Sequence, residues 1–573
     1  MMEYFSQNGY YGYYKDEKFV SIGYDILVTQ AWRHLESGKL TFEVEFCVGT
    51  DIITVKTSYA TFRDDVEAAG FAVPDNVKHH YKAYLRQQID NLSTVEYLHE
   101  ELGWEKGDGK PVFKGYKLKG SNKTSTYDGD YDISPRGDRT DFIAEMRRVI
   151  LPNIKLVLGM ILGLSACVVG FLKANAVNID TIICSIVGRS TTGKSTVAKL
   201  AASMGGSVVG VKKGKRSLFG NCSATENAIE ERCNGNYGEP VVFDEIGRFK
   251  KQTDFSQLLY DLAEGTNKDR LDSNSKLRKP KTWSTTVIFT GEFSILSKVD
   301  KTDGLSLRLL SFEYDQWTNS PEESHEVEKF FAQYNGRGID MFAEEILRHK
   351  PDVIIRAFWR IVRITQSKLS VAPEYCERIA KSIAVMLLTA LLAQRVFRFK
   401  LGIKTLAELI LSSISNSQQR PMWQTAYEHF CAFVKRNPGI FNFKIKDSRG
   451  ILQWSSSDHV PFYKDAGYVA REGGGTDIDE VFIVTPKFDE WAKNEELPDK
   501  NPILQEWERN GLMKFKDSKH KEMTRSISHE KNNRRHGYRI FIKDIFADEN
   551  DDEPEEIKPL SKAEIDEMLS DDE

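Results

Sequence analysis

The group of residues best suited to chemistry in this sequence is an octet able to hold a phosphate group. An apolar run that begins at Asp180 leads into Gly-Arg-Ser-Thr-Thr-Gly-Lys-Ser at residues 188–195. The two glycines let successive backbone N–H groups face an anion, and a helix that begins after the second glycine adds its dipole. Lys194 would contact the β- and γ-phosphates, and the Ser195 hydroxyl would reach Mg²⁺. The spacing therefore predicts a P-loop between a buried strand and a helix.

A second feature is an apolar strand that ends in two acids, Glu-Pro-Val-Val-Phe-Asp-Glu at residues 239–245. Asp244 lies 50 residues after Lys194, with a helical pattern between them. Asp244 would orient the ligands of Mg²⁺ through water, and Glu245 would polarise an attacking water as a general base. A nucleotide switch does not need the second acid, so the pair indicates hydrolysis.

A later apolar strand also ends on polar residues. Residues 283–292 read Trp-Ser-Thr-Thr-Val-Ile-Phe-Thr-Gly-Glu, and either Thr290 or Glu292 would face the terminal phosphate as a sensor. Arg308 stands 18 residues after Thr290 in the otherwise apolar run Gly-Leu-Ser-Leu-Arg-Leu-Leu. Its cation would reach the nucleotide of a neighbouring subunit and stabilise transition-state charge. The alternative is an arginine that pairs locally at a strand edge.

Two basic segments interrupt the apolar pattern. The shorter is Val-Lys-Lys-Gly-Lys-Arg at 211–216, which we expect to form a loop. The longer, 265–283, carries six Lys or Arg against two acids around the turn residues Asp-Ser-Asn-Ser. This composition is typical of a hairpin that presents cations to a phosphate backbone, and a solvated loop is the alternative. The predicted DNA contacts in this hairpin are Lys268, Arg270, Lys276 and Arg278.

The order of these motifs resembles that of the superfamily III helicases, a branch of the AAA+ ATPases. Leu102-Gly-Trp104, the Gly-Lys-Ser loop, Phe-Asp-Glu-Ile-Gly247, Phe-Thr-Gly-Glu292 and the following arginine are similar, more closely, to helicase-like replication proteins of phages, plasmids and staphylococcal mobile islands. The resemblance covers residues 1 to about 320 and is weaker beyond them.

The resemblance implies a self-loading replicative helicase that binds ATP and Mg²⁺ and forms a hexameric ring around DNA. It implies that Arg308 is a finger acting in trans and that Lys268 and Arg270 lie on the DNA-gripping hairpin. Such helicases commonly carry Asn as the first sensor, whereas the strand here ends in Thr-Gly-Glu. The catalytic residues would be Lys194, Glu245 and Arg308. The nucleotide contacts would be Gly188, Arg189, Ser190, Thr191, Thr192, Gly193, Lys194, Ser195, Thr196, Asp244 and Thr290, with Ser195 and Asp244 at the metal.

The chain is long enough for several domains, and we predict an α/β AAA+ P-loop core with four flanking parts. The N-terminal α+β module covers 1–140, the ATPase core 141–318, a helical subdomain 319–415, a winged-helix-like DNA-binding domain 416–546 and an acidic disordered tail 547–573. Within the helical subdomain, the apolar spacing predicts helices at 323–333, 339–349, 353–369 and 375–399.

The N-terminal module contains one alternating strand, Leu40-Thr-Phe-Glu-Val-Glu-Phe46. We expect its apolar side chains to point inward and Glu43 and Glu45 to face solvent. The alternative is that the two acids hold metal in a primase-like site.

The C-terminal domain contains a strongly basic stretch. Residues 512–543 hold ten Lys or Arg against three acids and follow a helical segment at 501–510. A helix followed by a basic wing is typical of a duplex-binding winged helix, and a charged loop between two strands is the alternative. The predicted duplex contacts are Arg525, Lys531, Arg534 and Arg535.

The charge of the chain is unevenly placed. The net charge is -5, but residues 547–573 contain 13 acids and two Lys, so the remainder is mildly basic and suited to nucleic acid. The tail is a candidate site for a replication partner. The seven cysteines show no spacing typical of zinc, and no secretory signal opens the chain, so we expect a reduced, cytoplasmic protein. The uncharged run 156–172 is read as a buried helix rather than a membrane span.

These features together predict an ATP-dependent helicase that initiates or supports replication of a mobile genetic element. The alternatives are a nucleotide-driven switch or defence ATPase, a primase-helicase, and a non-enzymatic origin-binding protein.

Overall fold

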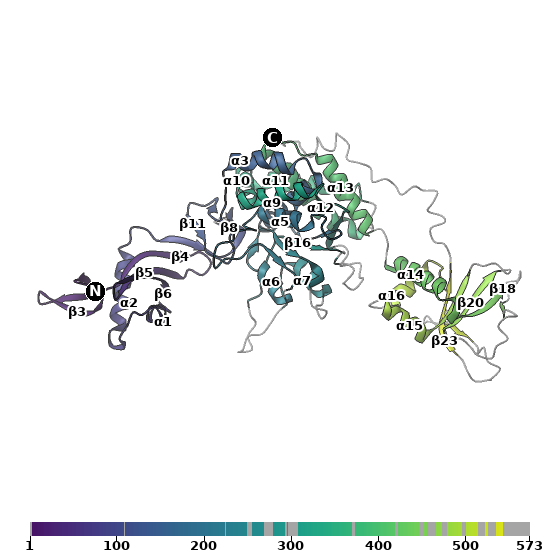
Figure 1. Ribbon diagram of the computed structural model, residues 1–573, viewed down its shortest axis with the longest axis horizontal. Coiled ribbons are helices and arrows are strands. Elements are labelled where there is room, and N and C mark those ends of the chain that lie inside the picture. Colours follow the sequence, from purple (N-terminus) through teal and green to yellow (C-terminus); the bar gives the residue numbers. More distant parts are fainter. Residues whose placement is uncertain are drawn as a thin grey trace.

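The computed structural model of the chain contains three bodies that follow one another in the sequence (Figure 1). An N-terminal module leads into a central body built around a parallel sheet, and a C-terminal body follows. The structure describes residues 3–107, 109–223, 225–248, 255–268, 279–292, 295, 308–369, 373–418, 422–446, 452–454, 466–472, 478–495, 500–513, 522–524 and 535–542. The predicted acidic tail at 547–573 lies outside these residues.

The N-terminal module pairs a five-stranded sheet, in the order β11-β7-β4-β5-β6, with two helices. Strand β5 (Leu40–Val48) alternates as predicted: its apolar side chains at 42, 44 and 46 are buried, and Glu43 and Glu45 between them are partly exposed. Among the residues that the structure describes, no three His, Cys, Asp or Glu are grouped to hold a metal. The other elements are β1 (Phe5–Gln7), β2 (Tyr10–Lys15), β3 (Lys18–Tyr24), β4 (Leu27–His34), β6 (Asp51–Ser58), α1 (Phe62–Ala68), α2 (Lys78–Asp90), β7 (Glu96–His99) and β11 (Ser125–Tyr127).

A short sheet, in the order β10-β9-β8-β14, forms a neck that joins this module to the central body. Strand β8 (Leu102–Gly107) pairs in parallel with β14 (Asn236–Tyr237), which lies far along the chain. Gly103 has φ +91, and a Cβ there would lie 2.1 Å from the carbonyl carbon of Tyr237, so only glycine fits. The remaining strands are β9 (Lys110–Lys114) and β10 (Leu118–Lys119).

The Leu-Gly-Trp stretch at residues 102–104 packs against the long helix α4 (Ile154–Ala174) and so connects the neck to it. Trp104 is 3% exposed, and its ring lies 5.1 Å from that of Phe171. Its indole N–H donates to the Sγ of Cys167 at 3.3 Å. Residues 102–133 therefore contribute to the central core, while the first 92 residues contain a core of their own.

The central sheet has five parallel strands in the order β13-β15-β16-β12-β17. All six residues of β12 are buried, which fits its continuous run of apolar and small side chains. Because the strands are parallel, their carboxyl ends meet at one edge of the sheet. The strands are β12 (Ile182–Val187), β13 (Phe219–Asn221), β15 (Val241–Asp244), β16 (Thr286–Gly291) and β17 (Leu309–Glu313).

Helix α4 is buried along its length and supports the sheet and its neighbouring helix, α5 (Lys194–Ser203). Every residue from 156 to 172 is buried, as predicted from its apolar run. A Cβ at Gly163 would lie 2.3 Å from the carbonyl oxygen of Ala201, so the missing side chain allows α4 and α5 to touch. Among the residues that the structure describes, two helices are long and apolar enough to cross a membrane, Ile154–Ala174 and Cys376–Phe397, and their most apolar windows are 89% and 72% buried inside the protein.

The remaining helices of the central body pack in two hydrophobic clusters, each of which includes residues of the sheet. Helices α11 and α12 begin at prolines 351 and 373, two residues before the predicted starts, because proline is well suited to the first turn of a helix. One hydrophobic cluster runs from Leu102 to Leu411 and includes residues of α9 to α13 and of the sheet, whereas α6 and α7 pack in a second cluster with Ile183, Phe243 and Phe289 of the sheet. The helices are α3 (Arg139–Glu145), α6 (Glu226–Cys233), α7 (Phe255–Glu264), α9 (Pro321–Gln333), α10 (Arg337–Arg348), α11 (Pro351–Gln366), α12 (Pro373–Phe397) and α13 (Ile403–Gln418), with the π-turn η2 (Met146–Ile150) after α3.

The C-terminal body packs helices on a six-stranded sheet in the order β19-β18-β20-β21-β23-β22. Trp507 of α16 is fully buried against Tyr427 and Phe430 of α14. Strands β22 and β23 pair antiparallel, as the two sides of a hairpin do. The elements are α14 (Met422–Arg436), β18 (Asn442–Lys446), β19 (Leu452–Trp454), β20 (Gly467–Glu472), β21 (Glu480–Val484), α15 (Thr485–Asn494), α16 (Lys500–Arg509), β22 (Glu522–Thr524) and β23 (Arg535–Phe541).

Because Trp104 is buried, we expect its replacement to lower the free energy of unfolding strongly. We expect Trp104→Ala to destabilise the central body by about 3–5 kcal/mol, because the substitution leaves a cavity between the neck and α4. Trp359→Ala is a matched control, since Trp359 is 38% exposed. Urea denaturation followed by circular dichroism measures both. Equal shifts in the two variants would contradict the packing role of Trp104.

Candidate functional site

The octet at 188–195 forms a loop between β12 and α5, as its spacing predicted. Gly193 has φ +90 directly before the first residue of α5. A Cβ at this position would lie 2.5 Å from the Oγ1 of Thr318, so both the backbone angle and the packing require glycine. The N-terminus of α5 therefore faces the space beside the loop, with unpaired N–H groups suited to an anion.

Lys194 lies at the inner side of this loop. Its Nζ donates to the carbonyl oxygen of Gly188 at 2.7 Å and also to that of Arg189. Burial lowers the pKa of the Lys194 ammonium, and the nearby carboxylates of Glu292, Asp244 and Glu245 partly oppose this shift. The cation is thus held close to the loop and among carboxylates.

Asp244, at the end of β15, is held by two hydroxyl groups. Ser195 donates to its carboxylate oxygens at 3.0 and 3.2 Å. Thr290, at the end of the adjacent strand β16, donates to Oδ1 at 2.5 Å. The start of α5 and the ends of β15 and β16 therefore meet at one carboxylate. Adjacent carboxylate and hydroxyl oxygens are the donor set that Mg²⁺ prefers, so Ser195 and Asp244 suit a metal.

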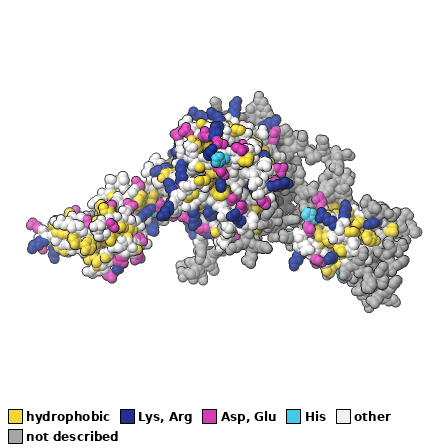
Figure 2. Space-filling model, in the orientation of Figure 1, with side chains coloured by type: hydrophobic (Ala, Val, Ile, Leu, Met, Phe, Trp, Pro, Cys, Tyr) yellow, Lys and Arg dark blue, Asp and Glu magenta, His cyan; other side chains and the backbone are white. Residues whose placement is uncertain are grey.

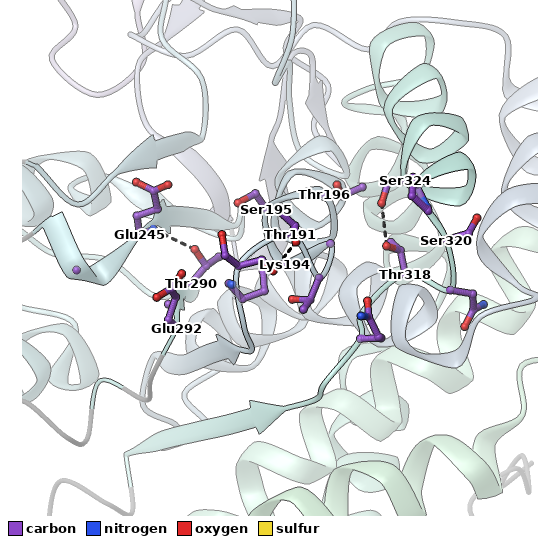
Figure 3. Close-up of a pocket in the computed structure, with 18 of the residues that line it drawn as sticks. Thr191, Lys194, Ser195, Thr196, Glu245, Thr290, Glu292, Thr318, Ser320 and Ser324 are labelled. Atoms are coloured by element: carbon purple, nitrogen blue, oxygen red, sulfur yellow. Dashed lines mark hydrogen bonds between the residues drawn. The ribbon is translucent and has the colours of Figure 1, made fainter.

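Thr290 also fixes the backbone of the second acid. Its Oγ1 accepts the N–H of Glu245 at 3.0 Å (Figure 3). Glu245 has φ +60, a conformation that is uncommon for a residue with a side chain. Its carboxylate forms an ion pair with Arg248 of the short turn η3 (Ile246–Arg248), and both side chains are about half exposed. The sequence did not single out Arg248.

Most of these groups line a cavity of about 850 Å³, whereas Asp244 and the predicted nucleotide contacts Gly188 and Arg189 are not among its lining residues. Figure 3 shows Glu245, Thr290 and Glu292 on one side of Lys194 and Thr318, Ser320 and Ser324 on the other. The cavity has room for a nucleotide, since ligand pockets typically occupy about 300–1,000 Å³. It is lined by Ser190, Thr191, Thr192, Gly193, Lys194, Ser195, Thr196, Glu245, Gly247, Arg248, Thr290, Gly291, Glu292, Gln316, Thr318, Asn319, Ser320, Pro321 and Ser324.

The segment 316–324 was missed by sequence reasoning. The N–H of Trp317 donates to the carbonyl oxygen of Thr192 at 2.8 Å, and its indole N–H donates to that of Val187 at 2.8 Å. Ser320 caps α9 by accepting the N–H of Glu323 at 3.2 Å. The Ser-x-x-Glu spacing at 320–323 is the sequence signal that marks this helix start, but it carries no information on the distant loop.

Arg308 is not among the cavity residues. It precedes β17, whose register with β12 pairs Leu309 with Ile183 and Glu313 with Val187. Arg308 thus lies at the amino ends of the strands, roughly 15 Å along the sheet from the P-loop. Its guanidinium lies 4.6 Å from the centre of the Tyr260 ring, and burial together with nearby Arg378 lowers its pKa.

The predicted DNA contacts are only partly described. Thr266 and Thr282 form an antiparallel bridge, so the ends of the segment 265–283 pair as in a hairpin, and Lys268 beside this base is exposed. Arg535 begins β23. The other predicted contacts, Arg270, Lys276, Arg278, Arg525, Lys531 and Arg534, lie outside the described residues.

Residues 45–282 match a family model described as a domain of unknown function, DUF927. The match runs from the N-terminal module through the neck and the strand that carries Asp244 to the residues just before β16, and it covers less than half of the chain. No curated protein matches the sequence.

The chain shares its fold with a solved structure described as the active helicase Cch of SCCmec type IV. The two are 23% identical with a TM-score of 0.71, and the similarity covers 95% of this chain and 98% of that chain. The C-terminal region of NrS-1 shows 10% identity and a TM-score of 0.25 over 67% of this chain and 91% of its own. A JCV helicase shows 12% identity and a TM-score of 0.17 over 45% of this chain and 72% of its own. TM-scores of 0.25 and 0.17 are too low to show a common fold. Of these three comparisons, the first shows that the two chains share a fold.

Proposed function

We propose that this protein is an ATP-dependent DNA helicase that acts as a ring in the replication of a mobile genetic element. The observation that carries the proposal is the hydroxyl of Thr290, which lines the P-loop cavity and hydrogen-bonds to both the carboxylate of Asp244 and the backbone N–H of Glu245. Phosphate binding alone does not need a positioned second acid, whereas hydrolysis does. The shared fold with a solved helicase supports the choice of reaction class.

The proposed cofactor is Mg²⁺, held by Ser195 directly and by Asp244 directly or through water. When bound, the metal would neutralise charge on the β- and γ-phosphates. Lys194 would exchange its two loop carbonyl partners for phosphate oxygens. Its partial burial would strengthen that charge–charge contact, because the local dielectric is lower than in water.

Glu245 is proposed as the general base. Its carboxylate would orient a water molecule and accept its proton as the bond to the terminal phosphate forms. The ion pair with Arg248 occupies this carboxylate, so the pair must open before Glu245 can act on water. Thr290 would hold the backbone of Glu245 in place throughout and act as the sensor.

The proposed ring gives Arg308 a role in trans. A cation at the opposite end of the strands cannot stabilise charge at the cavity of its own chain, but a head-to-tail neighbour could present it to the next cavity. We propose a hexamer in which Arg308 completes each site in trans.

The proposed DNA contacts lie in two places. The paired base of segment 265–283 supports a hairpin whose cations line the pore. In the C-terminal body, α15 and α16 precede the antiparallel pair β22 and β23 at one edge of the six-stranded sheet, and helices followed by such a pair support a proposed winged helix that binds duplex DNA. The acidic tail remains a proposed site for a replication partner.

The proposal is tested by unwinding of a forked DNA duplex with ATP and Mg²⁺. We expect Glu245→Gln to bind ATP but not to unwind, and Arg308→Ala to lose unwinding as well. Arg363→Ala, an exposed arginine on α11, is the matched control and should unwind normally. Hydrolysis of ATP by the wild type without strand separation on a fork of either polarity would instead favour a nucleotide switch or defence ATPase.

The hydrogen bond between the Thr290 hydroxyl and the backbone of Glu245 leads to a second prediction, on the rate of ATP hydrolysis. Thr290→Val keeps the shape of the side chain but removes the hydroxyl, which leaves the Glu245 N–H without its partner. We expect kcat for ATP hydrolysis to fall by about 10²-fold with little change in nucleotide affinity, because the general base loses its position. Thr290→Ser keeps the hydroxyl and should retain most of the activity. A Thr290→Val variant as active as Thr290→Ser would exclude this role.

A further inference from the structure

A basic surface lies on the neck, and none of its residues lines the cavity. Figure 2 shows Lys and Arg side chains gathered over the neck between the N-terminal module and the central body. Its cations come from two parts of the sequence, the segment 115–136 and the loop 207–216 that follows α5. We call this surface the neck patch, and its members are Lys117, Lys123, Arg136, Lys212, Lys213, Lys215 and Arg216.

Backbone hydrogen bonds hold the loop 207–216 against residues 130–132 of the segment 115–136. The N–H of Ser207 donates to the carbonyl oxygen of Asp132 at 2.8 Å, and the N–H of Asp132 donates to that of Arg216 at 2.9 Å. The N–H of Arg216 in turn donates to the carbonyl oxygen of Asp130 at 2.7 Å. The loop therefore presents its cations from a fixed backbone.

Acids do not neutralise the neck patch. The two segments contain three acids, of which Asp128 pairs with Lys56 of β6. Asp132 is buried and binds Arg136 at 2.7 Å, and Asp130 lies 3.8 Å from Arg216. Among the described residues, no carboxylate forms an ion pair with four of the patch lysines, which are Lys117, Lys123, Lys213 and Lys215.

Two tyrosine rings lie among these cations. The ammonium groups of Lys117 and Lys212 lie 5.8 and 5.7 Å from the centre of the Tyr116 ring, although the two lysines are far apart in the sequence. The ammonium of Lys123 lies 5.5 Å from the Tyr97 ring. Both rings are partly exposed. Cations that alternate with accessible aromatic rings are typical of surfaces that bind single-stranded nucleic acid, because phosphates contact the cations and bases stack on the rings.

We infer that the neck patch binds single-stranded DNA without sequence preference. The rings favour a single strand over duplex, whose bases are already stacked. The excess of cations favours a polyanion over an ordinary protein surface. The inference rests on the proposed function only for the choice of DNA as the polyanion.

The patch is also connected to the nucleotide cavity. Helix α5 begins at the P-loop, and the loop 207–216 follows its other end. Ten helical residues span about 15 Å, so a strand on the neck patch would lie one rigid helix away from Lys194.

The test compares two triple variants of the full chain. Lys117→Ala, Lys123→Ala and Lys213→Ala together remove three patch cations without exposing a buried acid. Lys39→Ala, Lys78→Ala and Lys82→Ala together remove the same charge from exposed positions of the N-terminal module. Binding of fluorescein-labelled oligo-dT and of a labelled duplex is measured by anisotropy without ATP at several salt concentrations, and basal ATP hydrolysis is measured alongside.

We expect the patch variant to bind oligo-dT about tenfold more weakly than the control. The slope of log K against log salt should become shallower by about two, because three phosphate contacts are lost. Replacement of the same three lysines by arginine should restore binding. Equal affinities of the two triple variants for oligo-dT, or a loss confined to the duplex, would overturn the inference. Basal hydrolysis unchanged in both variants separates this result from a failure of the proposed ATPase.

Discussion

The hydroxyl group of Thr290 connects the two acids on which the candidate site depends. It donates to Asp244 and accepts from the backbone of Glu245, so one side chain orients both. This is possible only because β16 lies between β12 and β15 in the parallel sheet. The order of the strands therefore brings the P-loop, the metal-binding oxygens and the general base of the proposed reaction to one edge.

The packing of α4 supports the edge of the sheet at which the strands β12, β15 and β16 end. The helix is buried against the sheet, α5 and the neck, and Gly163 allows α5 to approach closely. The Leu-Gly-Trp stretch attaches the neck to the same helix through Trp104 and Cys167. The elements that carry the candidate site, the neck and the loop 207–216 thus pack on one core, which is why we treat the neck patch as connected to the cavity.

The local parts of the site could be predicted from the sequence. Glycines at 188 and 193 followed by Lys and Ser, and an apolar strand ending in Asp-Glu, are signals confined to a few neighbouring residues. The strand β5 and the helices of the central body followed from their apolar spacing. The segment 316–324 could not be predicted, because Thr318 meets Gly193 only after the chain has passed through the whole sheet.

Two further residues, Arg248 and Trp104, make contacts that a local sequence pattern cannot predict. Arg248 is one of many exposed arginines, and its ion pair with Glu245 depends on the turn geometry of η3. Trp104 belongs to the Leu-Gly-Trp stretch that resembles helicase-like replication proteins. Its packing against α4, however, depends on a parallel strand pair between positions far apart in the sequence. Long-range pairing of this kind leaves no periodic signal in either segment.

Subunit mixing tests most directly the claim that each site is completed by Arg308 of a neighbour. Glu245→Gln and Arg308→Ala chains, each inactive alone, would be co-expressed with different tags and purified as mixed assemblies. The account predicts that the mixture hydrolyses ATP at about one quarter of the wild-type rate, since random head-to-tail placement rebuilds that share of the sites. A mixture that stays inactive despite confirmed co-assembly, or an Arg308→Ala chain that is active alone, would contradict it.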